Sequence, residues 1–268
     1  MSTSVLAVSV DAIAVLGPGL PDWSAAEAYL TGQTGYEPAP VVLPAPIALP
    51  AVERRRTGRA VRLALALGFE AAARAGLDPS STPAVFSSSG GDGHNCHEIC
   101  SALATSERQL SPTRFHNSVH NAPAGYWSIA SGATATSTSL CAYDASFAAA
   151  LLEAATQVVV DRTPVLVIAY DTDYPAPLHS KRPIPDAFGV ALALRPEPGT
   201  GSLARLVVGI TEEEPSALAN PALERLRREY PAARSLPLLS LLARREAGSV
   251  ALEYLLPSCV SVEVVPCA

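Results

Sequence analysis

The chain has 268 residues, of which 49% are hydrophobic and only 16% are charged, and its net charge is −6. A chain of this length can bury a full core, and its negative charge argues against a nucleic-acid or anionic-membrane surface, which would need a basic field. The low charged content predicts more exposed apolar area than a monomer usually carries, and such area indicates a protein partner.

The cysteines and the amino-terminal residues bear on the cellular location of the protein. Five cysteines form no even framework in a chain that is not small, so a reducing cytoplasm is the expected location. The apolar start at residues 5–16 contains Asp11 and has no basic residue before it, which makes it a poor signal peptide. No uninterrupted apolar run reaches membrane-spanning length. We therefore expect a cytoplasmic protein without a membrane span.

The hydrophobic pattern predicts alternating strands and helices. A strand at residues 5–16 leads to a Gly-x-Gly exit, and a proline-rich connector over residues 36–50 cannot form regular structure. A helix over residues 59–76 has a wide apolar face and ends at Gly76. Further strands are expected at residues 84–88, 137–142, 165–170, 188–194, 203–208, 249–255 and 260–265. Further helices are expected at residues 95–105, 121–131, 145–160, 221–229 and 236–247.

One part of this pattern has a topological consequence. The strand at residues 137–142, the helix at 145–160 and the strand at 165–170 form a βαβ unit, which predicts parallel pairing through a right-handed crossover. No internal repeat or low-complexity linker divides the chain. We expect a single domain over residues 1–268.

Residues 137–155 read as a buried strand, a sharp turn and an alanine-rich helix, which is the architecture of a nucleophile elbow. Upstream, residues 111–125 are SPTRFHNSVHNAPAG. This stretch resembles the pattern SPxxFxxSxxNxxAG, by which β-ketoacyl synthases of the thiolase fold approach their active-site cysteine. Aligning the final Ala-Gly pair without gaps places Asp144 at the position of the nucleophilic cysteine.

The resemblance covers residues 3–195, which correspond to one half of a ketosynthase. It implies an α/β fold that is one half of a thiolase-like fold, with a mixed sheet, βαβ units and covering helices, plus a C-terminal extension over residues 196–268. The missing half supplies the two catalytic histidines of the family, and no histidine follows His179 here.

Asp144 is a poor replacement for a catalytic thiol. A thiolate is a strong nucleophile whose pKa can be lowered at a helix N-terminus, whereas a carboxylate attacks thioesters weakly and would be held in its charged form by the helix dipole. We expect Asp144 to cap the following helix through backbone N–H groups. Cys141 is expected to be buried in the strand, as a small hydrophobic side chain rather than a displaced nucleophile.

Two histidine-containing clusters allow other interpretations. His116 and His120 precede the elbow and could line a polar pocket beside Asp144, where a His–Asp pair can move a proton. This leaves open an independent thiolase-fold decarboxylase or thioester hydrolase that uses Asp144 with His116 or His120. His94, Cys96, His97 and Cys100 lie within seven residues, but zinc sites normally add a second ligand pair. No metal and no cofactor are expected.

A ketosynthase-like half without its nucleophile resembles the truncated chain-length factors of aryl-polyene, type II polyketide ketosynthases. The resemblance implies a noncatalytic subunit that pairs with a β-ketoacyl synthase and closes its acyl tunnel, with an acyl carrier protein reached through the complex and a homodimer possible for the chain alone. The expected tunnel and interface residues are Arg114, Phe115, His116, Val119, His120, Leu140, Cys141, Tyr143 and Asp144. The expected carrier contacts are Arg54, Arg55, Arg56 and Arg59, for which a solvated helix face is the alternative.

Overall fold

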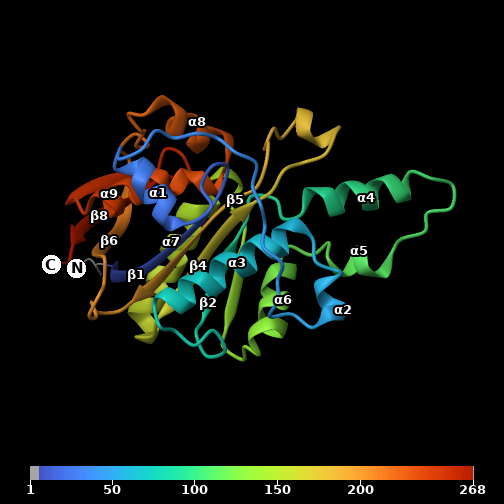
Figure 1. The fold of residues 1–268 in the computed structure, drawn as a ribbon, viewed down its shortest axis with the longest axis horizontal. Coiled ribbons are helices and arrows are strands. Elements are labelled where there is room, and N and C mark those ends of the chain that lie inside the picture. The colour runs from blue at the N-terminus through green and yellow to red at the C-terminus, as the bar shows by residue number, and fades with distance from the viewer. Residues whose placement is uncertain (1–5, 268) are drawn as a thin grey trace.

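The strands form one mixed sheet in the computed structural model, which describes residues 6–267 (Figure 1). Across the sheet the strands follow the order β3-β2-β4-β5-β1-β6-β8-β7. Their bounds are β1 Leu6–Leu16, β2 Ala84–Ser87, β3 Ser137–Leu140, β4 Val165–Asp171, β5 Phe188–Arg195, β6 Ala204–Thr211, β7 Gly248–Glu253 and β8 Cys259–Pro266. This sheet confirms the predicted α/β class, while the predicted strand start at Val5 lies outside the described residues.

The parallel part of the sheet lies at one edge. β2 pairs in parallel with β3 on one side and with β4 on the other. The chain passes from β3 through helix α7 (Ser146–Asp161) to β4, so the predicted parallel direction is confirmed. The predicted direct pairing of these two strands is wrong, because β2 lies between them. Within residues 6–267, β3 therefore has β2 as its only neighbour.

Alternate side chains of the central strands enter two apolar layers, as the period of a strand requires. On β4, Val165 and Val167 face the layer that contains α7, whereas Leu166 and Ile168 face the layer that contains α3 (Arg59–Arg74). Helix α6 (Ala122–Ser131) packs on α3, and α1 (Trp23–Leu30) and α9 (Leu236–Arg244) pack together. Helices thus cover both faces of the sheet (Figure 1).

Local capping explains where these helices begin and end. The Asp22 carboxylate accepts a 2.8 Å hydrogen bond from the Ala25 N–H at the start of α1, which offsets one unsatisfied donor of the first turn. After α3, Gly76 has a φ of +60°, a left-handed conformation that glycine adopts without a Cβ penalty. The predicted stop of this helix is confirmed.

A projecting segment, residues 93–120, is called the arm below. It contains α4 (Gly93–Leu103) and α5 (Pro112–His116) and extends away from the sheet beside α2 (Ala51–Arg54) (Figure 1). Only Gly93 and Asn95 of α4 are buried. Because so little of α4 is buried, the arm gains little stability from the body of this chain. An isolated helix of this length is itself marginal in water.

The residues after β5 extend the same sheet. β6 pairs with β1 and β8, and β8 pairs with β7. The intervening helix α8 spans Pro221–Glu229, and three short 3₁₀ turns are η1 Tyr143–Ala145, η2 Leu178–Ser180 and η3 Ala232–Ser235. Because the strands of residues 204–266 continue the sheet, they favour the expectation of a single domain. No helix within residues 6–267 is both long and apolar enough to cross a membrane.

Candidate functional site at the strand–helix elbow

The elbow lies where β3 passes into α7. After Leu140 the chain turns through η1, and Tyr143 takes a φ of +53°. This left-handed conformation costs a residue with a side chain roughly 1–2 kcal/mol. A strained residue on a strand-to-helix turn is typical of a nucleophile elbow, but here the strain falls on Tyr143 and not on Asp144. The Tyr143 side chain is 62% exposed.

Asp144 is held by two arginines. Its Oδ1 accepts a hydrogen bond from Arg182, and its Oδ2 accepts one from Arg234 Nη2 at 3.0 Å. The predicted capping role is wrong, because α7 has no side-chain cap and the ion pairs use both carboxylate oxygens. Ser146 ties the turn instead, since its Oγ accepts from the Ala142 N–H at 3.0 Å and donates to the Tyr143 carbonyl at 2.7 Å.

The two arginines belong to a larger elbow ion-pair cluster. Arg234 also pairs with Glu253 at the end of β7, which accepts from Arg227 of α8 at 3.0 Å. Arg227 donates in turn to Glu224 at 2.8 Å, and this bond is the largest cause of a Glu224 pKa lowered to about 2. The cluster comprises Asp144, Arg182, Arg234, Glu253, Arg227 and Glu224. It connects the elbow to four segments that lie far along the sequence, namely the loop before β5, α8, η3 and β7.

Arg182 has a second contact at the elbow. Its guanidinium lies 3.9 Å from the centroid of the Tyr143 ring, within the range of a cation–π interaction. The side chain is therefore fixed by a carboxylate on one side and an aromatic ring on the other. Together these contacts occupy the space directly above the strained turn.

A fully buried carboxylate, Asp171, lies at the end of β4. Its oxygens accept from the Ser89 N–H at 2.8 Å, the Ser89 hydroxyl at 2.6 Å and the Ala232 N–H at 3.0 Å. Burial raises the pKa of Asp171 to about 6, because desolvation of the charged form outweighs these hydrogen bonds. Asp171 thus joins the loop after β2 to η3.

Cys141 differs from its expected position. The thiol is exposed and donates to the Ser89 carbonyl at 3.2 Å. The expected burial is wrong because β3 ends at Leu140 and lies at the sheet edge, so no neighbouring strand covers the next residue. Leu140 itself is half-buried.

The histidines of the arm do not bind Asp144. The His120 ring lies 3.1 Å, through Nε2, from the Ser88 carbonyl, and the His116 ring packs edge-on against Tyr126 with centroids 6.1 Å apart. Among residues 6–267, the hydrogen-bonding partners of the Asp144 side chain are the two arginines. The structure therefore does not form the predicted polar pocket that pairs these histidines with Asp144.

The other arm residues lie on an open surface. Phe115 is 66% exposed and Val119 is 53% exposed, and Arg114 pairs with Glu98 at 3.2 Å. Leu103 and Leu110 of the same arm are also exposed. These predicted tunnel residues are close to one another in sequence, but the elbow carboxylate does not contact them.

The four arginines expected at a carrier interface differ in how strongly they are bound by other groups of this chain. Arg54 donates to the Leu49 carbonyl, and Arg59 pairs with Asp173 and Asp186. Arg56 pairs with Glu53 at 3.2 Å across an exposed surface, and Arg55 donates to the Ala51 carbonyl. Arg55 and Arg56 are therefore the members of this group that are most available to a partner.

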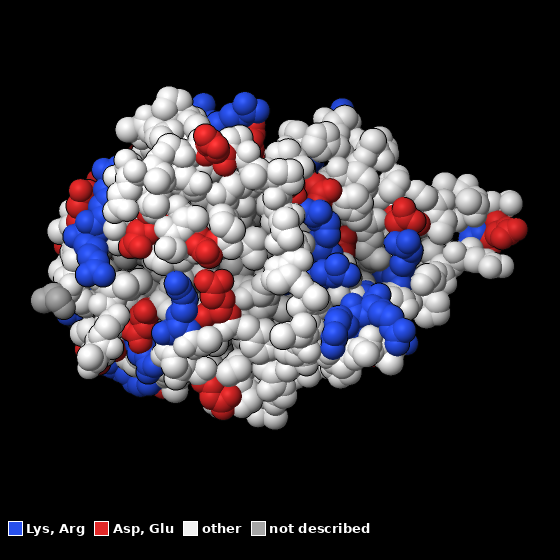
Figure 2. Space-filling view, viewed as in Figure 1, with Lys and Arg blue, Asp and Glu red and all other residues white. Residues whose placement is uncertain are grey.

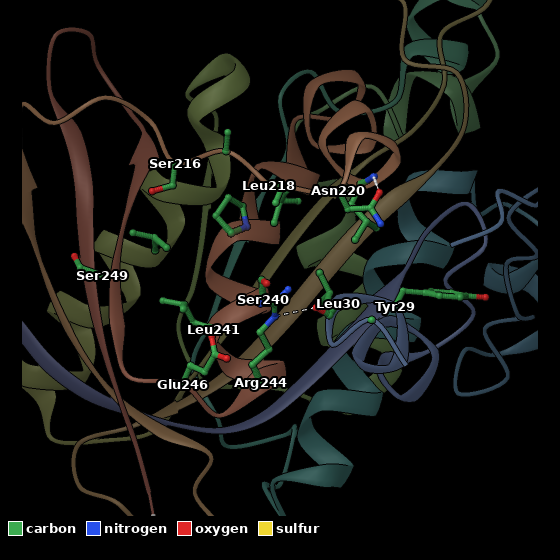
Figure 3. A pocket seen from close by; sticks show the side chains of 16 residues that line it. Tyr29, Leu30, Ser216, Leu218, Asn220, Ser240, Leu241, Arg244, Glu246 and Ser249 are labelled. Atoms are coloured by element: carbon green, nitrogen blue, oxygen red, sulfur yellow. Dashed lines mark hydrogen bonds between the residues drawn. The ribbon is translucent and has the colours of Figure 1, made fainter. Parts of the chain in front are cut away.

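A pocket of about 370 Å³ lies away from the elbow, between α1, α9 and residues 216–220 (Figure 3). Figure 3 shows Arg244 donating to the Leu30 carbonyl, a 3.1 Å bond that joins α9 to the end of α1. None of the predicted site residues lines this pocket. Residues 6–267 contain no group of three or more His, Cys, Asp or Glu side chains arranged to hold a metal.

Comparison with known proteins identifies the class. The sequence matches the family described as "Beta-ketoacyl synthase, N-terminal domain" over residues 23–253, so the chain belongs to this family. No curated protein matches the sequence significantly. The family assignment agrees with the resemblance carried by residues 111–125.

Three of the similar solved structures are chains of ketosynthase complexes. A chain of "Ketosynthase (ApeO) in Complex with its Chain Length Factor (ApeC) from Xenorhabdus doucetiae" is similar at a TM-score of 0.71 and 22% identity, covering 96% of this chain and 98% of that one. A chain of "The ishigamide ketosynthase/chain length factor" gives 0.72 at 14% identity and covers 97% and 99%. A third, from a type II polyketide ketosynthase with its acyl-carrier protein, gives 0.72 at 11% identity with the same coverage. These similarities confirm the predicted thiolase-like half fold.

The sequence missed the arginines of the elbow cluster. Arg182 lies in a loop between β4 and β5, and Arg234 lies in η3, 38 and 90 residues after Asp144. No motif links them to the elbow. A pairing of the lone elbow carboxylate with distant arginines becomes visible only once the sheet order brings these loops to one edge.

Proposed function

We propose that this chain is a noncatalytic chain-length-factor subunit that pairs with a β-ketoacyl synthase and closes its acyl tunnel in polyene, polyketide or fatty-acid-like biosynthesis. The observation that carries the proposal is the ion-paired Asp144 at the elbow, where both carboxylate oxygens bind arginines. A carboxylate committed in this way is a weaker nucleophile still. The elbow retains the family architecture, while the side chain at its nucleophile position is committed to ion pairs.

The free edge of β3 supports pairing with a partner. The Thr136 and Leu140 carbonyls accept from the Ala84 and Ser88 N–H groups of the β2 segment. Because strand backbone groups alternate in direction, the N–H and C=O of Ser137 and Ser139 point to the free edge. Such unpaired groups are a template for another strand, and the proposed partner strand comes from the ketosynthase.

The arm supports tunnel closure. Its exposed apolar side chains, Leu103, Leu110, Phe115 and Val119, lie on a segment with few contacts to the body. Several exposed apolar side chains on one projecting segment favour an interaction site. We assign Arg114, Phe115, His116, Val119 and His120 to the tunnel and subunit interface, together with Leu140, Cys141, Tyr143 and Asp144 at the elbow.

The carrier protein is proposed to bind the complex on its arginine face. Arg55 and Arg56 are the available contacts. Arg54 and Arg59 are supporting contacts, and their side chains also bind groups of this chain. An acidic carrier would be attracted by this positive face. The proposed location of the complex is the cytoplasm, and the chain alone is proposed to form a homodimer.

Co-expression tests the pairing. The chain and a candidate β-ketoacyl synthase are expected to purify as a one-to-one complex, measured by mass. Ser139→Pro removes an N–H from the free edge without removing a bond to β2, because Ser139 points away from that strand, and is expected to abolish the complex. Ser139→Ala is the matched control, since it keeps the N–H and should retain the complex.

Two outcomes would contradict the proposal. One is a Ser139→Pro chain that folds and still binds the synthase as wild type does. The other is turnover of an acyl thioester by the purified chain alone that Asp144→Ala abolishes, which would establish an independent enzyme.

Product length tests tunnel closure. Phe115→Ala and Val119→Ala in the complex are expected to lengthen the acyl product, because each methylene accommodated or refused is worth roughly 1–3 kcal/mol. Mass spectrometry of the released acyl chains provides the measurement. Val160→Ala is the matched control, since Val160 is equally exposed but lies at the end of α7. Unchanged product length in the Arg114, Phe115 and Val119 variants would count heavily against a tunnel-closing arm.

A further inference from the structure

A groove of about 630 Å³ separates the α2–α3 turn from the base of the arm. Five arginines line it, Arg55, Arg56, Arg59, Arg62 and Arg114, and Asp92 is its single acidic lining residue. The remaining lining side chains are hydroxyls, amides and one imidazole, with no apolar side chain. Figure 2 shows blue atoms gathered over this region, where α2 and α5 meet in Figure 1. The composition excludes an acyl chain as the occupant and favours a hydrophilic anion.

Amide side chains fix the two walls, one half-buried and one buried. Asn117 Nδ2 donates to the Arg56 carbonyl at 2.8 Å, and Tyr126 donates to Asn117 Oδ1 at 3.0 Å, which sets the orientation of that amide. On the other wall, Asn95 Nδ2 donates to the Arg114 carbonyl at 2.8 Å. The backbones that carry Arg56 and Arg114 are therefore positioned before any ligand binds, which reduces the cost of ordering them.

Several guanidinium groups in the groove remain available. Arg62 has a single hydrogen bond, from Nε to Thr57 Oγ1 at 3.3 Å, and no carboxylate partner within residues 6–267. Within residues 6–267, the exposed arginines Arg56 and Arg114 form ion pairs only with Glu53 and Glu98. Exposed pairs of this kind contribute little, so a stronger anion can displace them. Arg59, by contrast, is committed to two aspartates.

We propose that this arginine groove binds a phosphate group that carries two or more negative charges, in a small phosphomonoester or pyrophosphate compound. Guanidinium groups match phosphate oxygens in bidentate geometry, and the volume is that of a small-ligand site. The groove is concave, and its principal ligand contacts lie outside the group of arginines proposed to meet the carrier protein. Arg62 and Arg114 are its principal contacts, and the binding does not depend on pairing with a ketosynthase.

Titration calorimetry with sodium pyrophosphate at constant ionic strength tests the inference on the full chain. Saturable one-to-one binding is expected, and it should weaken as sodium chloride is raised. Arg62→Ala and Arg114→Ala are each expected to weaken binding about tenfold or more. Arg62→Lys keeps the charge without the planar fork and should bind with intermediate affinity. Arg74→Ala, at the other end of α3, is the matched control and should bind as wild type does.

The inference would be overturned by an absence of saturable pyrophosphate binding to the wild-type chain. Equal losses in Arg62→Ala and Arg74→Ala would overturn it too, because they would indicate diffuse attraction. Binding of an acidic carrier protein that requires Arg62, without pyrophosphate binding, would replace it with a protein-docking surface. Circular dichroism identifies any variant that has not folded. If an alanine variant has not folded, the pyrophosphate affinity of Arg62→Lys decides the test.

Discussion

Asp144 holds the elbow through ion pairs with two arginines. Removing its carboxylate leaves Arg182 without an acidic partner in the described part of the chain, and Arg234 with Glu253 only. Arginines that are mostly buried and lose a partner destabilise the folded state. We expect Asp144→Ala to lower the free energy of unfolding by about 2 kcal/mol, measured by urea denaturation.

The control for this change lies at the far end of the helix that follows the elbow, α7. Asp161 is exposed at the last residue of α7, where a negative charge opposes the helix dipole. Asp161→Ala should therefore leave stability within about 0.5 kcal/mol of wild type. An Asp144→Ala protein as stable as Asp161→Ala would show that the ion-pair cluster does not stabilise the elbow.

Asp171 gives stability a distinctive pH dependence. Its pKa rises from 3.8 to about 6 on folding, so the folded state binds the proton more tightly than the unfolded state does. The stabilisation from this residue is complete below about pH 4 and is lost as pH rises to about 6, with a size of roughly 3 kcal/mol.

Comparison with Asp171→Asn isolates this effect. Urea denaturation of both proteins between pH 4 and pH 7 should show the wild-type advantage shrinking up to about pH 6 and then remaining constant, because the amide does not titrate. A difference between the two proteins that stays flat over this range would contradict the raised pKa.

At the scale of elements, α3 and α6 meet at a glycine. A Cβ built on Gly68 would lie 2.7 Å from the Trp127 ring and 2.8 Å from Ile168 Cδ1, whereas one on Gly125 of α6 would meet nothing within 4 Å. Alanine usually stabilises a helix by about 1 kcal/mol over glycine. We expect Gly68→Ala to destabilise by about 1–3 kcal/mol through overpacking, and Gly125→Ala to stabilise or have no effect. Thermal unfolding of the two variants in opposite order would contradict this packing.

Element prediction from sequence succeeded where the apolar pattern was long. The helix of residues 145–160 and the strand of residues 188–194 carry clear periodicity, and both are present in the structure as α7 and β5. The sequence missed α1, because its eight residues follow a Gly/Pro-rich turn and give too short a window for a 3.6-residue period. The order of strands in the sheet was predicted less well. The local sequence pattern does not indicate that β2 lies between β3 and β4.

At the scale of the whole molecule, the candidate site could be predicted only in part. The elbow and the arm residues 111–120 lie in one continuous stretch, residues 111–144, and the sequence pattern of that stretch identified them as candidates. The ion-pair cluster around Asp144 could not be located, because Arg182 and Arg234, which bind Asp144, and Glu253, which binds Arg234, belong to three separate segments that only the folded chain brings together. The same holds for the arginine groove, whose walls come from residues 55–62 and from the arm.

The position of β1 has a consequence for synthesis on the ribosome. β1 precedes the other described strands along the chain, yet both of its neighbours, β5 and β6, lie between residues 188 and 211. The apolar side chains of β1 therefore have no neighbouring strand to pair with until these residues have emerged, and pairing over such separations is slow. During that interval the nascent chain carries an unpaired hydrophobic strand, and a strand of this kind is prone to aggregation unless it is protected.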